Sequence, residues 1–457
     1  MVEAMANSVE DYLIDGLSFK LSPGASYVQD RRSVSYFTAG SNIYQSGTGA
    51  RVIRINLTGD GWLDPSTVRL VYTLRNNAGQ ALRVIGGPWS FFRRVRCLVG
   101  GAIVDDVDFY NRVHEMLHIL SSKNNRDNDD IEGFGYRWDS DYNYSQYDTA
   151  AHARAALTGI AANSYRTVSF KPLIGLFSQS KYIPLMWCPL TLEFEIVSSA
   201  TDAIGSTIAG GAFEDANTST AWQIEDVRVV CDVVTLDSAL QNSYAEHVLS
   251  GKALPINYGT YVSILQACAG PNINVNVTRA VSRLKTLFFN FDTPHNAAAG
   301  DGNGRSLILK DWNSFVHPMG GAFDATREVQ WQVQIGSKLF PEYPCRSAAQ
   351  TYYELKKALG IASSAFHSIS PTMTQFINDH FLIGVDTERI LEAGFTGLNT
   401  RSGDLMSIRV QGANGPLAAD FANKIYIILH SDQILEVRDT KAFIFQREIT
   451  RLSKIII

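Results

Sequence analysis

Residues 91–106, FFRRVRCLVGGAIVDD, and residues 329–342, VQWQVQIGSKLFPE, decide the fold of this 457-residue chain. In each stretch, apolar and polar residues alternate up to a glycine turn, which is Gly100–Gly101 in the first and Gly336 in the second. Successive side chains of a β-strand point to opposite faces of a sheet, so this pattern predicts a hairpin of half-buried strands.

The elements around these hairpins occur twice in the same order. Each hairpin is preceded by a further strand, VRLVYTLRN at 68–76 and LKTLFFNFD at 284–292. Each is followed by a stretch with helical spacing, YNRVHEMLHILSS at 110–122 and YYELKKALGIASS at 352–364, and these two helical stretches lie 242 residues apart. Repetition of strand, hairpin and helix predicts that the chain is a structural duplication.

Other strands are predicted from the same period of two. They lie at 53–57, 190–196, 222–233, 331–335 and 406–411. The alternation slips once after Ile224, and a β-bulge explains such a slip. Three long polar stretches, 121–165, 198–220 and 293–306, are expected to be surface loops.

Length and pattern together predict an all-β protein of two tandem eight-stranded antiparallel jelly rolls, with short helices and long surface loops. A chain of 457 residues is too long for one ordinary domain, and its 45% hydrophobic content can fill two cores. The predicted division is an N-terminal arm over 1–30, a first jelly roll over 31–238 and a second over 239–457.

Composition argues against several functions. The net charge is -5, and the densest basic cluster, Arg93, Arg94 and Arg96, lies inside a predicted strand, so packaging of nucleic acid through a basic arm is not expected. The five cysteines are widely spaced and odd in number, which indicates neither a disulfide framework nor a cysteine-rich zinc site and favours synthesis in a reducing compartment. The first residues do not resemble a signal peptide, and no apolar run approaches the ~20 residues of a membrane span.

Two long segments carry a resemblance to a known family. They are GLFSQSKYIPLMWCPLTLEFEI at 175–196 and IEDVRVVCDVVTLDSAL at 224–240, the latter followed by HVLSGKALPI at 247–256. With these segments the chain resembles the double jelly-roll major capsid proteins of eukaryotic DNA viruses, above all those of the polinton-like virus and virophage group. In that family, comparable segments close the first jelly roll and open the second.

The resemblance implies a structural role in a virion. Three subunits would form a homotrimer with a pseudo-hexagonal outline, and such trimers would tile an icosahedral shell. The implied partners are neighbouring capsomers and minor capsid proteins of the penton, with no sequence-specific nucleic acid, and an internal membrane is left open. The N-terminal arm would lie on the inner side and brace neighbours, either through the apolar residues Leu13, Ile14, Leu17 and Phe19 or by packing on its own domain.

One motif favours an enzyme instead. His114-Glu115-Met116-Leu117-His118 matches the H-E-x-x-H spacing with which a zinc peptidase holds its metal on one helix face. A third ligand is missing from the following sequence, where Glu132 is a poor candidate, and the second half has Lys356 at the position of His114. The preferred interpretation is a structural helix, at a surface or interface, with two partly exposed histidines. A zinc-dependent hydrolase is the alternative.

Weaker signals predict no further site. An acidic loop lacks the spacing of a calcium site, the glycine-rich stretch 300–304 lacks the ending of a phosphate-binding loop, and aromatic residues in a predicted loop favour a protein interface. A glycan-binding β-sandwich that uses those aromatic residues is a second alternative. No catalytic, cofactor-binding or metal-binding residue and no cofactor is predicted. The acidic residues are Asp127, Asp129, Asp130 and Glu132, and the aromatic ones are Tyr136, Trp138, Tyr142, Tyr144 and Tyr147.

Overall fold

The structure is a computed structural model. It describes residues 27–47, 50–82, 84, 86–122, 125, 129, 131–134, 160–204, 207–209, 212–214, 219–292, 315, 317, 329–361, 369, 371, 376, 380–388, 396–401, 405–412, 422–438 and 441–445. Within these residues no helix is long and apolar enough to cross a membrane.

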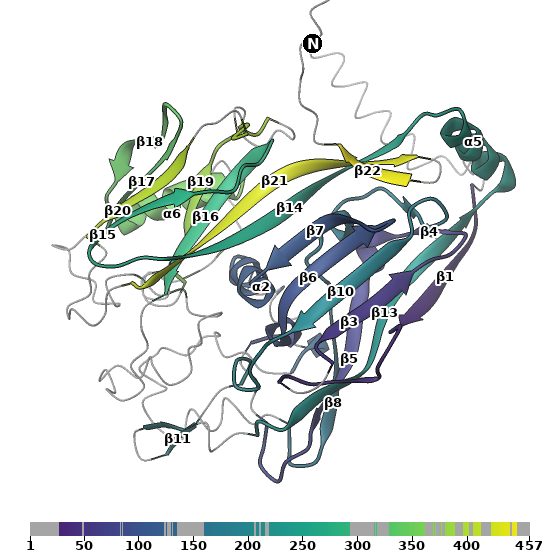
Figure 1. Ribbon diagram of the computed structural model, residues 1–457, viewed down its shortest axis with the longest axis horizontal. Coiled ribbons are helices and arrows are strands. Elements are labelled where there is room, and N and C mark those ends of the chain that lie inside the picture. Colours follow the sequence, from purple (N-terminus) through teal and green to yellow (C-terminus); the bar gives the residue numbers. More distant parts are fainter. Residues whose placement is uncertain are drawn as a thin grey trace, which may run out of the picture.

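Eight main strands of the first half form two antiparallel sheets (Figure 1). One sheet has the order β1-β13-β5-β8 and the other the order β3-β10-β6-β7, and the short strands β2, β4 and β9 extend the first sheet. The strands are β1 (Val28–Phe37), β2 (Ile43–Tyr44), β3 (Val52–Leu57), β4 (Trp62–Leu63), β5 (Arg69–Asn76), β6 (Phe92–Val99), β7 (Ala102–Asp108), β8 (Tyr165–Phe170), β9 (Ile183–Pro184), β10 (Leu190–Ile196) and β13 (Trp222–Leu236).

The second half repeats this arrangement. Its sheets have the orders β14-β21-β16-β19 and β15-β20-β17-β18, and β22 pairs with β21. The strands are β14 (Leu254–Ala267), β15 (Asn272–Val277), β16 (Leu284–Asp292), β17 (Gln330–Ile335), β18 (Lys338–Cys345), β19 (Ile383–Asp386), β20 (Met406–Gln411), β21 (Lys424–Arg438) and β22 (Lys441–Phe445).

The two halves share one connectivity. When the eight main strands of each half are numbered along the chain, both halves have sheets of order 1-8-3-6 and 2-7-4-5. A helix follows the fifth strand in each half, α2 (Tyr110–Ile119) in the first and α6 (Ala348–Ala358) in the second. The prediction of two tandem eight-stranded antiparallel units is confirmed.

Both helices lie where the sequence places them, with one shift. An offset of 242 residues from Tyr110 predicts that the second helix begins at Tyr352, but α6 begins one turn earlier, at Ala348. The cause is a cap: the side chain of Ser347 accepts a hydrogen bond from the backbone N–H of Gln350 at 3.1 Å.

Turns and a bulge fix the strand registers. Gly100 and Gly101 have φ of 55° and 86°, and this left-handed conformation favours glycine in the tight turn between β6 and β7. The predicted bulge after Ile224 is confirmed, because the pairing of β13 with β5 shifts between Glu225 and Arg228 and the intervening Asp226 has φ of 53°.

Several elements were not predicted. Helix α5 (Ser238–Leu249) connects the two halves; the Asp237 side chain caps it, but only Val248 in it is buried, so it has no apolar stripe to reveal it. The stretch 198–220, expected to be a loop, contains a hairpin of β11 (Thr207–Ala209) and β12 (Ala212–Glu214). The described residues also include three short 3-10 helices: η1 (Pro65–Thr67), η2 (Pro88–Phe91) and η4 (Gly175–Phe177).

Strand β3 shows how the alternation builds the core. Its residues are buried and exposed in strict alternation, so that Ile53, Ile55 and Leu57 have no exposed surface while Val52 is 46% exposed. None of the five cysteines is in a disulfide, and all except Cys268 are buried.

The two faces of β3 provide a matched test of this packing. We expect Ile55→Ala to lower the free energy of unfolding by about 2–5 kcal/mol, because it leaves a cavity in the first core. Val52→Ala on the same strand is the control and should change it by less than about 0.5 kcal/mol. Denaturant titration followed by tryptophan fluorescence measures both, and equal effects of the two substitutions would contradict the assigned faces.

Candidate functional site at the junction of the two sandwiches

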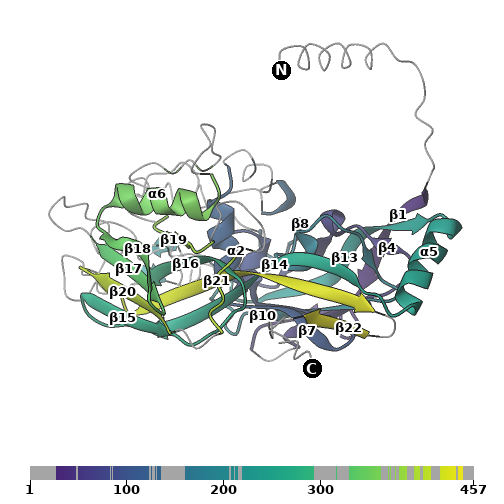
Figure 2. The same ribbon diagram turned by 90° about the horizontal axis from the view of Figure 1, so that it is seen from above.

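Helix α2 lies between the two sandwiches and carries the H-E-x-x-H motif (Figures 1 and 2). Seven of its ten residues are buried, Glu115 among them, whereas His114 and His118 are partly buried. The helix is therefore more enclosed than the predicted surface or interface helix, although both histidines keep some exposure.

Trp89 of η2 packs against the motif. Its indole stacks on the imidazole of His114 with ring centroids 4.2 Å apart and lies 4.6 Å from that of His118. The indole N–H donates a hydrogen bond of 2.7 Å to the Glu115 carboxylate. All three side chains of the motif thus contact one tryptophan.

Burial also changes the chemistry of His114. Desolvation lowers its pKa to about 3, with a smaller contribution from the neighbouring His118. Within the described residues, no group of three His, Cys, Asp or Glu side chains is placed to hold a metal. The helix is part of a packed core, and the geometry gives no support to a zinc centre.

Arg112 of the same helix joins the two halves. Its side chain is buried, and its Nε and Nη2 donate to Oδ1 of Asn290 on β16 at 3.0 and 2.6 Å. Its guanidinium also lies 3.7 Å from the ring centroid of Tyr426 on β21, a favourable cation–π contact. Removal of Asn290 would leave the buried guanidinium without these acceptor bonds, which usually costs about 1–3 kcal/mol and more for a charged group.

Asp105 of β7 makes the second polar contact of the junction. Its carboxylate accepts hydrogen bonds from Thr260 Oγ1 on β14 at 2.5 Å and from the backbone N–H of Gly175 at 2.6 Å. The hydroxyl of Tyr258, also on β14, donates to the carbonyl of Val104 at 2.9 Å. Burial raises the pKa of Asp105 to about 6, although these hydrogen bonds act in the opposite direction.

Backbones also approach closely at this junction. A Cβ atom added to Gly175 would lie 2.0 Å from the carbonyl oxygen of Gly259, so only glycine fits at position 175 without movement. Close backbone packing and buried hydrogen bonds together hold the two sandwiches in a defined relation.

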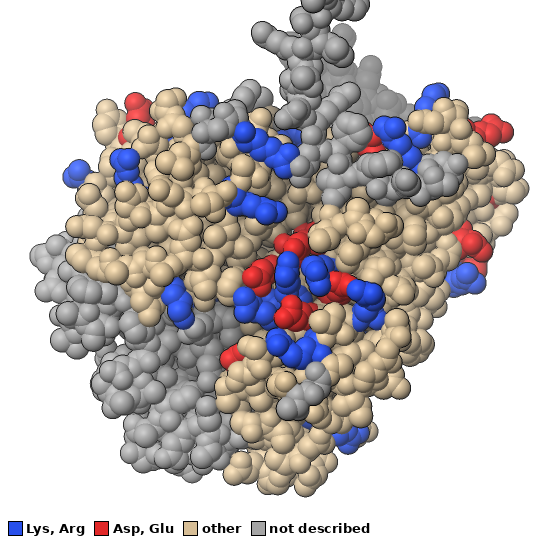
Figure 3. All heavy atoms as spheres, in the orientation of Figure 1, with Lys and Arg blue, Asp and Glu red and all other residues tan. Residues whose placement is uncertain are grey.

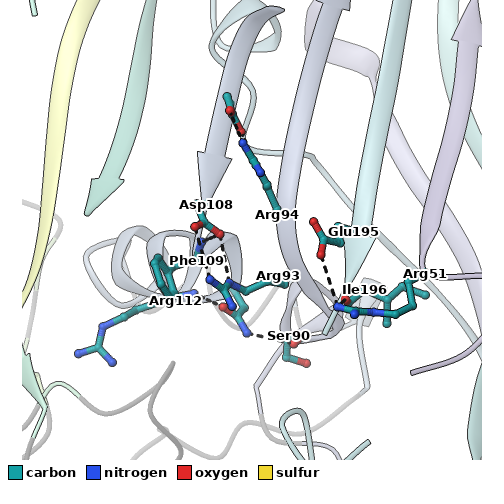
Figure 4. A network of polar contacts seen from close by, with 11 residues as sticks. Arg51, Ser90, Arg93, Arg94, Asp108, Phe109, Arg112, Glu195 and Ile196 are labelled. Atoms are coloured by element: carbon teal, nitrogen blue, oxygen red, sulfur yellow. Dashed lines mark hydrogen bonds and ion pairs between the residues drawn. The ribbon is translucent and has the colours of Figure 1, made fainter. Parts of the chain in front are cut away.

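A network of charges covers the outer face of β3, β10, β6 and β7 (Figures 3 and 4). Its charges alternate by strand, so each carboxylate lies beside an arginine of a neighbouring strand. Arg94 and Asp106 make two hydrogen bonds of 2.7 Å, and Glu193 lies between two arginines. The ion pairs are Arg54 and Arg96 with Glu193, Arg51 with Glu195, Arg94 with Asp106, and Arg93 with Asp108.

The basic cluster found in the sequence belongs to this network. Arg93, Arg94 and Arg96 lie on β6 as predicted, and each is paired with a carboxylate. They therefore do not form an unneutralised surface for phosphate groups.

The acidic residues of the predicted loop are only partly described. Glu132 lies 3.6 Å from Arg69, and Asp129 lies 3.8 Å from Nδ1 of His118. Both line a pocket of about 230 Å³ beside His114. In the described part of this loop, the contacts of Glu132 and Asp129 are thus with Arg69 and His118.

Comparison with solved structures identifies the fold, whereas comparison of the sequence with family models and curated proteins gave no match. PBCV-1 VP54, fitted into a reconstruction of the virophage Sputnik, has a TM-score of 0.59 at 12% identity over 94% of this chain and 100% of that chain. The cryo-EM structure of the Sputnik virophage has a TM-score of 0.59 at 9% identity over 94% and 90%. The Faustovirus major capsid protein has a TM-score of 0.53 at 9% identity over 93% and 94%.

The chain has the double jelly-roll fold. The predicted resemblance to double jelly-roll major capsid proteins is confirmed at the level of the fold, over nearly the whole of both chains. The junction and the charged face described above are thus features of a double jelly roll.

Several predicted features lie outside the described residues of this double jelly roll. The N-terminal arm up to residue 26 is outside them, and Val28–Asp30, which were assigned to the arm, are part of β1. The other features are the apolar residues Leu13, Ile14, Leu17 and Phe19, the acidic residues Asp127 and Asp130, the loop aromatics Tyr136, Trp138, Tyr142, Tyr144 and Tyr147, and the stretch 300–304.

The residues that join the two jelly rolls were not predicted as functional. Arg112 and Asp105 are charged residues within an apolar helix and strand pattern, and this conflict was the available signal in the sequence. Their partners Asn290 and Thr260 are more than 150 residues away along the chain, so the pairing itself appears only in the structure.

The packing of α2 predicts the metal content of the protein. We expect purified protein incubated with zinc and then desalted to retain no stoichiometric metal, because the indole of Trp89 contacts both histidines of the motif. His114→Ala should leave the metal content unchanged and lower the melting temperature, because it removes the stacked ring. Stoichiometric zinc that disappears in His114→Ala would contradict this structural role.

Asp105 predicts a pH dependence of stability. Its folded pKa of about 6 lies above the ordinary value of 3.8, so the folded state takes up its proton first. Wild type should therefore gain stability relative to Asp105→Asn, on the order of 2 kcal/mol, as the pH falls from about 7 to about 4.

The comparison with Asp105→Asn isolates this one group. Burial lowers the pKa of His430 to about 4 and that of His114 to about 3, so both histidines reduce the stability of the folded protein as the pH falls. This effect is common to wild type and Asp105→Asn and cancels in the comparison. Denaturant titrations of both proteins at several pH values measure the difference. A difference that does not change with pH would refute the assignment.

Proposed function

We propose that this double jelly roll is a major capsid protein, located in the virion. Three copies form a homotrimer with a pseudo-hexagonal outline, and such capsomers tile an icosahedral shell. Its partners are neighbouring capsomers and minor capsid proteins at the pentons, and its role is structural, not catalytic. The proposed division of the chain is an N-terminal arm, a first jelly roll up to residue 238 and a second over 239–457, with Val28–Asp30 moved from the predicted arm over 1–30 into β1 of the first jelly roll.

One observation carries this proposal: two units of identical strand order are fixed side by side in one chain. Three such chains supply six similar units, which is what a pseudo-hexagonal building block needs. Buried contacts of Arg112 and Asp105 support it, because a shell component must present its two halves in a constant relation. The structural likeness to the Faustovirus major capsid protein and to PBCV-1 VP54 agrees with this role.

The alternatives have less support. A zinc hydrolase would need His114, Glu115 and His118 to face a metal, but all three contact Trp89. A glycan-binding protein would rest on loop aromatics that lie outside the described residues, so no observation favours it.

The experiment is a measurement of mass and shape in solution. We expect light scattering to give three times the chain mass of 50.4 kDa, and negative-stain images to show a hexagonal outline. A protein that stays monomeric at every concentration and hydrolyses peptides or binds glycans would contradict the proposal.

A further inference from the structure

The junction within the chain pairs particular elements of the two jelly rolls. Strand β7, the fifth main strand of the first unit, contacts β14, the first strand of the second unit. Tyr258 and Thr260 of β14 make the hydrogen bonds to Val104 and Asp105 of β7. The contact is therefore one of a fifth strand with a first strand.

The duplication supplies the same two elements a second time. The fifth strand of the second unit is β18, and the first strand of the first unit is β1. Within the described residues, β18 pairs only with β17 and is an edge of its sheet, whereas β1 pairs along its length with β13. Both strands are largely exposed.

The exposed surfaces of these strands include large apolar side chains. On β1, Val28 is 45% and Phe37 63% exposed, and on β18, Leu339 is 40% and Tyr343 81% exposed. In the internal junction, by contrast, Tyr258 of β14 is 3% exposed. The exposed apolar side chains of β1 and β18 are thus available for contact with another copy, whereas Tyr258 of β14 is already buried in the internal junction.

β1 and β18 lie at opposite ends of the molecule (Figures 1 and 2). One chain cannot bring them together, but two chains can. We propose that β18 of one copy packs against β1 of the next copy and repeats the internal junction between chains. This inference rests on the proposed function, because it specifies the contact that closes the trimer.

Registers identify the position on β1 that corresponds to Tyr258. On β13, Val229 pairs with Leu70 of the third strand, and Val233, four residues later, pairs with Arg32 of β1. On β21, Leu429 pairs with Leu287 of the third strand, and Gln433, four residues later, pairs with Tyr258 of β14. With Leu70 and Leu287, both fully buried, taken as equivalent positions of the two third strands, Arg32 occupies the place of Tyr258.

The two strands have complementary charge at these positions. Arg32 is exposed on β1. The register counterpart of Asp105 on β18 is Phe340, because Asp105 pairs with Cys97 and Phe340 pairs with Val333, and Cys97 and Val333 each lie two residues before the end of their strand. Glu342 lies two residues beyond Phe340 and is exposed. An Arg32–Glu342 ion pair between copies would replace the internal hydrogen bonds to Val104 and Asp105. A head-to-tail contact of this kind closes into a ring when its rotation fits, and three two-unit chains give six units.

Charge reversal tests the contact in the full-length protein. Arg32→Glu and Glu342→Arg should each raise the protein concentration at which half of the trimer dissociates by about tenfold or more, because each places like charges opposite one another. The double variant should restore the wild-type value. Arg166→Glu, an exposed reversal on β8, is the control and should leave it unchanged.

A cross-link tests the same contact without reliance on stability. Arg32→Cys with Glu342→Cys should form a disulfide under mild oxidation, and denaturing gels without reductant should show covalent species that end at three chains. Wild type is oxidised in parallel as the control for its five natural cysteines. Circular dichroism spectra of all variants check that they are folded.

The outcomes separate this contact from the proposed function. If wild type is a trimer, but neither charge reversal changes its dissociation and the double cysteine variant forms no cross-link, the contact is wrong and the capsid proposal still stands. A ladder of covalent species beyond three chains would overturn ring closure. A wild-type protein that never forms a trimer would overturn the proposed function itself.

Discussion

The buried contact between Arg112 and Asn290 is the constraint on which the arrangement of the molecule depends. A guanidinium without surface exposure is tolerated only where acceptors and an aromatic face replace the water it has lost. Asn290 and Tyr426 supply these groups, and both belong to the other jelly roll. The first unit therefore satisfies its own helix only when the second unit is in place.

Asp105, a residue of opposite charge in the first unit, depends on the second unit in the same way. Its carboxylate is buried beside the second unit and is satisfied in part by Thr260 of that unit. One positive and one negative residue of the first unit thus both take partners from the second. Two sandwiches that merely shared a linker would not need such contacts, so the double unit behaves as one building block.

Most of the fold could be predicted from the sequence because the signals are local. Alternation in β3, the glycine turn after β6 and the phase slip at Ile224 depend on neighbours a few residues apart, and the structure shows each of them. Helix α5 was missed because a capped but largely exposed helix has no apolar stripe. The contacts of the candidate site could not be predicted because its pairs join residues far apart in the chain. The H-E-x-x-H motif is a local signal, and in the structure its three side chains all contact Trp89.

The two units differ most on their outer faces. The strands β15 and β17 of the second unit carry asparagine and glutamine at outward positions, such as Asn274 and Gln332, where the first unit carries ion pairs. In the first unit, five arginines oppose four carboxylates across adjacent strands. Because each row cancels the next, the electric field of this face decays within a few side-chain lengths. A face of this kind exerts little long-range attraction or repulsion on a neighbouring molecule. The ionic strength of the solution should therefore have little effect on how closely two such faces approach one another.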